Sequence, residues 1–75
     1  MIEKTFKTGD KIKLIAIPPY LKTAEPMPML RPSDIIEIGE EGIVLDNRPG
    51  NYWGVKFKQG NFLMEAQYID LINNE

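Results

Sequence analysis

Proline constrains the fold of this chain more than any other residue type. The segment from residue 17 to residue 35 holds five of the six prolines. Because proline lacks a backbone N–H and has a fixed φ, this segment can form neither a helix interior nor a central strand. It is also too apolar for a flexible linker, since it carries Tyr20, Leu21, Met27, Met29 and Leu30. We expect a structured loop with exposed apolar side chains, a good candidate for a binding surface.

The composition excludes most catalytic chemistry. The 75 residues include no Cys and no His, which removes disulfides, thiolate nucleophiles, the usual zinc ligands and the imidazole base of catalytic triads. The chain is therefore expected not to be an enzyme and to hold no cofactor or metal. Its length allows a single domain over residues 1–75, with residues 1–7 and 73–75 expected to fray.

The hydropathy pattern gives an expectation for location. No apolar run approaches the roughly 18 residues of a membrane span, so direct membrane insertion is not expected. The first ten residues, MIEKTFKTGD, lack both the apolar stretch of a secretory signal and the composition of a transit peptide. The sequence alone therefore predicts a cytoplasmic protein.

Charge alternates in blocks along the chain. Residues 1–32 and 48–60 are net basic, whereas 33–47 and 61–75 are net acidic, and the whole chain carries −2. Nucleic-acid binding needs a continuous basic face, which these blocks interrupt, so a nucleic-acid partner is not expected. Complementary patches on a protein partner suit the pattern better, and we expect the chain itself to be a monomer.

The pattern of apolar residues predicts strands and no long helix. Alternation is clearest in Tyr52–Phe57, where Trp53, Val55 and Phe57 share one face. A short 3₁₀ turn is expected at residues 66–68, and hairpin turns are expected at 47–51 and 58–61. The five predicted strands span residues 11–17, 41–46, 52–57, 62–65 and 69–72. These lengths predict an all-β fold, a small five-stranded SH3-like barrel with a long proline-rich first loop.

The candidate binding residues come from the proline-rich loop and its expected neighbours. Lys22, Arg31 and Arg48 are expected to form a polar rim around it. Trp53 either anchors the core or contacts a partner, and its alternation with Val55 favours the core. Some loop side chains are expected to cover Ile15 and Ile17. The full predicted protein-binding set is Pro19, Tyr20, Leu21, Lys22, Met27, Met29, Leu30, Arg31, Arg48 and Trp53.

Several segments together resemble the SipA family of small cyanobacterial proteins. They are GDKIKLIAIPPYLKTAEPMPMLRPSD (9–34), GEEGIVLD (39–46), RPGNYWGVKF (48–57) and the G-x-F-L-x-x-x-Q-Y-I pattern (60–69). The resemblance implies a non-enzymatic regulator that binds the catalytic region of the sensor histidine kinase NblS, with its response regulator as a further partner. The implied pathway is the cyanobacterial response to strong light and nutrient stress.

Two other functions stay open from the sequence. One is an accessory protein of a photosynthetic complex, because a small component of photosystem I has this barrel type. The other is a nucleic-acid-binding barrel, against which the charge pattern argues. The loop itself does not resemble a ligand of proline-reading domains, because no two of its prolines are three residues apart. We therefore expect it to be part of a receptor surface.

Overall fold

The computed structural model describes residues 5–25 and 29–72, and its regular structure there consists of strands and two short 3₁₀ turns. No helix in these two ranges has the length and apolar character needed to cross a membrane. The strands are β1 (Lys11–Leu14), β2 (Leu21–Thr23), β3 (Leu30–Arg31), β4 (Glu41–Arg48), β5 (Tyr52–Phe57), β6 (Gly60–Glu65) and β7 (Ile69–Leu71), and the 3₁₀ turns are η1 (Ser33–Ile35) and η2 (Ala66–Tyr68).

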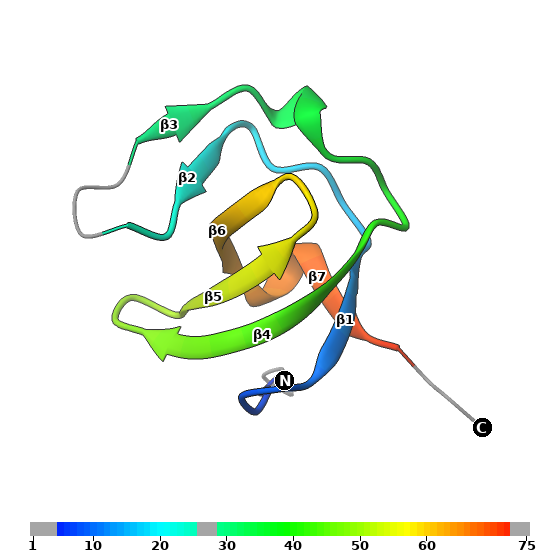
Figure 1. Ribbon diagram of the computed structural model, residues 1–75, viewed down its shortest axis with the longest axis vertical. Coiled ribbons are helices and arrows are strands. Elements are labelled where there is room, and N and C mark those ends of the chain that lie inside the picture. Colours follow the sequence, from blue (N-terminus) through cyan, green and yellow to red (C-terminus); the bar gives the residue numbers. More distant parts are fainter. Residues whose placement is uncertain (1–4, 26–28, 73–75) are drawn as a thin grey trace.

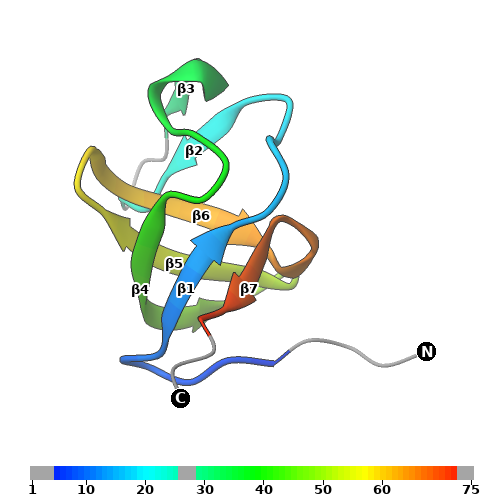
Figure 2. The same ribbon diagram turned by 90° about the vertical axis from the view of Figure 1, so that its right-hand side faces the viewer.

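All described strands form one antiparallel sheet in the order β3-β2-β6-β5-β4-β1-β7. The sheet bends back on itself, so that β5 and β6 cross behind β4, β1 and β7 when viewed from the side (Figure 1, Figure 2). It stays open, because its two edge strands, β3 and β7, do not pair with each other. The predicted all-β class is confirmed.

The predicted number of strands is wrong. The proline-rich segment contributes two strands, β2 and β3, where the sequence predicted a loop. They form because residues 20–25 and 29–31 contain no proline and therefore keep their backbone N–H groups. β2 makes two residue pairs with β6 and two with β3. A closed five-stranded barrel is therefore not what the chain forms.

Strands β4, β5 and β6 form a continuous meander with the longest ladders of the sheet. The predicted turns are confirmed, with Gly50 at φ 81° and Asn51 at φ 64° in the first and Gly60 at φ 146° ending the second. In the β4–β5 ladder the register shifts between Val44 and Asp46, so Leu45 has no cross-strand partner. This bulge places the Asp46 carboxyl against Gly54, where any Cβ would collide with Asp46 Oδ1.

The core lies inside the bend and draws on nearly every strand. Its buried side chains are Phe6, Ile12, Leu14, Leu21, Ile36, Val44, Val55, Phe57, Phe62, Met64 and Ile69. Trp53 is half-buried against this cluster and meets Phe6 edge to face, with ring centroids 5.2 Å apart. Phe6 belongs to the segment expected to fray, and in the structure it is buried with the Trp53 ring as a packing partner.

The first strand is shorter than predicted, since β1 ends at Leu14. The Ile15 N–H donates to the Tyr68 carbonyl at 2.8 Å, which directs the chain towards η2 and out of the β1–β4 ladder. Ile15 and Ile17 stay 37% and 42% exposed, so the expected cover over them does not form. The predicted 3₁₀ turn at residues 66–68 is confirmed as η2.

Candidate protein-binding site

The proline-rich arm, defined as residues 18–25 and 29–32, is held to the sheet by Thr23. The buried Thr23 hydroxyl accepts a hydrogen bond from the Met29 N–H at 2.8 Å, and the Thr23 N–H donates to the Met29 carbonyl at 2.8 Å. On the other side, β2 pairs with β6 through Lys22–Leu63 and Thr23–Phe62. The arm is thus fixed at its centre and carries its remaining side chains outward.

Some of the predicted binding residues on the arm are exposed to solvent and one is buried. Tyr20, Met29 and Leu30 are 52%, 55% and 64% exposed, and Pro19 and Arg31 are also exposed. Leu21 is fully buried, so its prediction as a contact residue is corrected. It points inward because β2 alternates, with Leu21 and Thr23 on the core side and Lys22 between them. Met27, also predicted to bind, lies outside the described residues.

A row of side chains runs across the outward face of β3, β2, β6 and β5. Directly paired residues in antiparallel strands share a face, and the register pairs Leu30 with Lys22 and Lys22 with Leu63. Tyr52 and Glu65 form the next pair on the β5–β6 ladder. We call these residues the outer face: Leu30, Lys22, Leu63, Tyr52 and Glu65.

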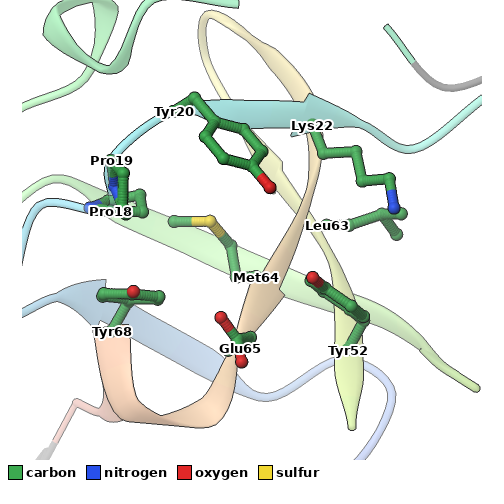
Figure 3. A pocket seen from close by; sticks show the side chains of 9 residues that line it. All are labelled: Pro18, Pro19, Tyr20, Lys22, Tyr52, Leu63, Met64, Glu65 and Tyr68. Atoms are coloured by element: carbon green, nitrogen blue, oxygen red, sulfur yellow. The ribbon is translucent and has the colours of Figure 1, made fainter. Parts of the chain in front are cut away.

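All of the outer-face residues except Leu30 also line a groove that we call the tyrosine groove (Figure 3). Its lining comes from the start of the arm, from β5 and β6, and from η2, and it encloses about 100 Å³. The lining residues are Pro18, Pro19, Tyr20, Lys22, Tyr52, Leu63, Met64, Glu65 and Tyr68. The Lys22 ammonium lies over the Tyr52 ring, 5.2 Å from its centroid, and fixes one end of the groove.

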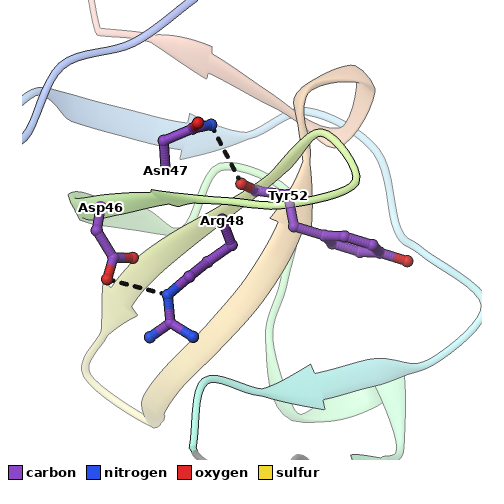
Figure 4. A network of polar contacts seen from close by, with 4 residues as sticks. All are labelled: Asp46, Asn47, Arg48 and Tyr52. Carbon is purple, nitrogen blue, oxygen red and sulfur yellow. Dashed lines mark hydrogen bonds and ion pairs between the residues drawn. The ribbon is translucent and has the colours of Figure 1, made fainter.

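Two predicted binding residues, Arg48 and Trp53, do not line this groove. The Arg48 side chain turns back to Asp46, where Nε donates to Oδ2 at 3.0 Å, while the Tyr52 ring extends the other way (Figure 4). Trp53 alternates with Tyr52 along β5 and packs on the core side. The structure therefore brings Pro19, Tyr20 and Lys22 together in the groove and puts Trp53 on the core side. Arg48 pairs with Tyr52 on the β4–β5 ladder but does not line the groove.

The sequence prediction missed Tyr52, Glu65 and Tyr68, although one signal was present. All three tyrosines of the chain line the groove, and tyrosine combines a flat apolar ring with a hydroxyl suited to a wet contact. They come from three separate segments, so only the folded sheet shows that they meet. In the part of the chain that the structure describes, no three acidic side chains gather closely enough to hold a metal ion.

Comparison with known proteins gives a family. The family model described as Protein CHLORORESPIRATORY REDUCTION 42-like (CRR42-like) matches residues 8–69. The chain is 30% identical over 64 residues to Protein CHLORORESPIRATORY REDUCTION 42, chloroplastic, from Arabidopsis thaliana. The match covers 84% of this chain and 53% of the relative, so the chain spans about half the relative's length. No solved structure matches.

These matches correct the SipA resemblance and what followed from it. The matched family is a different one, so the histidine kinase NblS, its response regulator and the stress-signalling role are wrong. The predicted cytoplasmic location is contradicted by the relative, which is chloroplastic.

Proposed function

Because the chain belongs to the Protein CHLORORESPIRATORY REDUCTION 42-like family, we propose that it is a non-enzymatic accessory protein of a photosynthetic complex. In this role it binds another protein and supports chlororespiratory reduction, the process in the relative's name. The observation that carries the proposal is the family match over residues 8–69, which includes the described arm, the outer face and the tyrosine groove.

The exposed apolar residues of the arm support a protein partner. Met29 and Leu30 are adjacent and both more than half exposed, and Tyr20, which lines the groove, is more than half exposed as well. A stable protein interface buries about 800 Å² per partner. The chain exposes 5290 Å², so the arm and the groove need to supply only about 15% of the surface.

The scaffold supports the same role. Strands β1, β4, β5, β6 and β7, with η2 before the last strand, follow the order expected of an SH3-like domain. We propose that the fold is an open variant of that architecture, in which β2 and β3 form an added arm. Such small β scaffolds present loops rigidly, which lowers the entropy lost when a partner binds.

Co-purification with membrane complexes tests the proposed function. A tagged chain expressed in its host should migrate with a photosynthetic complex on native gels after mild detergent extraction, and a salt wash should not remove it. Deletion should slow reduction of the membrane electron carriers in darkness, followed by chlorophyll fluorescence. A chain that stays free of every such complex, in a deletion strain with normal dark reduction, would overturn the proposal.

A matched pair of variants tests whether the arm is the surface that binds the complex. Leu30 and Ile38 are both 64% exposed, but Leu30 lies on the arm and Ile38 precedes β4. Leu30→Asp should reduce co-purification at least tenfold, because it places a charge in an apolar contact. Ile38→Asp should leave it unchanged. Equal losses for the two variants would remove the arm from the interface.

A further inference from the structure

The tyrosine groove opens where strand pairing stops. The β2–β6 ladder ends at Lys22–Leu63, and the chain before β2 runs back through Tyr20 to Pro19 and Pro18. Neither proline has an N–H to continue the ladder, so the arm and β6 separate. Side chains from both segments line the gap (Figure 3).

The size and surface of the groove suit protruding side chains more than a separate small molecule. Its volume of about 100 Å³ is well below the roughly 300 Å³ at which small-molecule pockets begin. Its walls are flat, because three phenol rings and two proline rings supply most of them. Flat aromatic walls favour proline rings, which pack on them with little loss of conformational entropy.

The polar groups of the groove are mostly donors. Three tyrosine hydroxyls and the Lys22 ammonium can donate hydrogen bonds, and the Glu65 carboxylate is the acidic group among them. A polyproline II segment has no internal hydrogen bonds and exposes its carbonyls, and its prolines lack N–H groups. A donor-rich groove therefore complements such a backbone.

Glu65 sets the charge of the occupant. Among the described residues, none donates a hydrogen bond to its carboxylate or forms an ion pair with it. Lys22 is held over the Tyr52 ring. An arginine or lysine of the occupant would pair with Glu65 through a charge-assisted hydrogen bond.

We propose that the tyrosine groove binds an extended, proline-containing segment of a partner protein that carries a basic side chain next to its prolines. Proline rings occupy the slots between Tyr20, Tyr52 and Tyr68, and the basic side chain pairs with Glu65. The inference rests on the proposed function only in taking the partner to be a protein. It adds the class of sequence that the partner presents.

Selection from a random library tests the ligand class directly. Twelve-residue random peptides displayed on phage are selected on the purified full chain, and bound peptides are sequenced. The expected result is enrichment of proline together with Arg or Lys at a fixed spacing. Enrichment of peptides without proline, enrichment of acidic peptides, preferential self-association of the chain, or no shared sequence would each overturn the proposal.

Variants then locate the bound peptide. For the strongest selected peptide, Tyr20→Ala and Glu65→Gln should each weaken affinity about tenfold by calorimetry. Glu41→Gln, at an exposed site on β4, is the matched control and should change nothing. Replacing the basic residue of the peptide with Ala should remove the Glu65→Gln effect, which a merely structural role of Glu65 would not do. A Glu65→Gln effect that persists with the Ala peptide would exclude the proposed ion pair.

The two proposals fail in different ways. In one outcome, the Tyr20→Ala variant loses binding to the selected peptides and still co-purifies with the complex. In that case the groove has the proposed specificity but does not hold the protein in that complex. If no peptide is selected while co-purification holds, the groove proposal fails and the accessory role stands.

Discussion

The meander of β4, β5 and β6 and the proline-rich arm belong to one sheet but are stabilised in different ways. The β5–β6 ladder registers six residue pairs, whereas β2 registers two pairs with β6 and two with β3. The meander buries Val44, Val55 and Phe57, whereas the arm leaves Met29 and Leu30 exposed. Dense strand pairing stabilises the meander, whereas the arm keeps apolar side chains exposed, as the proposed binding role requires.

The largest expected effect comes from truncating a core side chain of the meander. Phe57 is 3% exposed, so Phe57→Ala should cost about 3–5 kcal/mol, close to the whole stability of a domain this small. Leu30→Ala on the arm should cost under about 0.5 kcal/mol. Urea titrations followed by circular dichroism measure both. Similar losses for the two variants would contradict the division between meander and arm.

A smaller effect is expected at the bulge within the meander. Gly54→Ala places a Cβ against Asp46 Oδ1 and should cost about 1–3 kcal/mol through overpacking. Asp46→Ala removes the opposing carboxyl, so the double variant should lose less stability than the two single losses added together. Thermal melts of the four proteins give this coupling. Strict additivity would mean that the two positions do not interact.

The hydrogen bonds of Thr23 test the attachment of the arm. Thr23→Val keeps the shape but removes the acceptor for the Met29 N–H, which should cost about 1 kcal/mol. Amide hydrogen exchange should accelerate at Met29 and Leu30 while the amides of β5 keep their protection. Uniform acceleration across all strands would show that arm and meander open as one unit.

The smallest effect is expected at the ion pair near the end of β4. Arg48 and Asp46 are 37% and 47% exposed, so water screens their attraction. Arg48→Met should change the free energy of unfolding by under about 0.5 kcal/mol, and the difference should shrink as salt is added. A loss that is larger and insensitive to salt would point to a packing role for the Arg48 side chain.

The meander was predictable from the sequence because its signals are local. Alternation places Val55 and Phe57 inward, and Gly50 and Gly60 mark the turns on either side of β5. The 3₁₀ turn before Ile69 was predictable for the same reason. In each case a few neighbouring residues determine the backbone conformation, and no distant contact is needed.

The arm and the groove were harder to predict because they depend on tertiary contacts. β2 has only three residues, so its alternation is not visible in the sequence. The pairing of Thr23 with the core residue Phe62 is what turns Leu21 and Thr23 inward. Neither β2 nor β3 was predicted, because the many prolines around them argued against strands in this segment. The groove joins Tyr20, Tyr52 and Tyr68 from three segments, and no spacing between them reveals their proximity. Arg48 was placed near the arm by loop order, and it pairs with Tyr52, whose ring contacts Lys22. Loop order could not show that the Arg48 side chain hydrogen-bonds to Asp46 two residues away.

Trp53 and its neighbour Tyr52 point to opposite faces of β5, so the indole and the phenols of the protein report on different sides of the sheet. Indole emission reports on packing against Phe6, because Trp53 lies on the core side of β5. The near-ultraviolet signal of the phenols reports on the groove, since every tyrosine of the chain lines it. Indole emission excited at wavelengths that phenols do not absorb can therefore follow unfolding, while the phenol signal follows ligand occupancy, in one unlabelled sample.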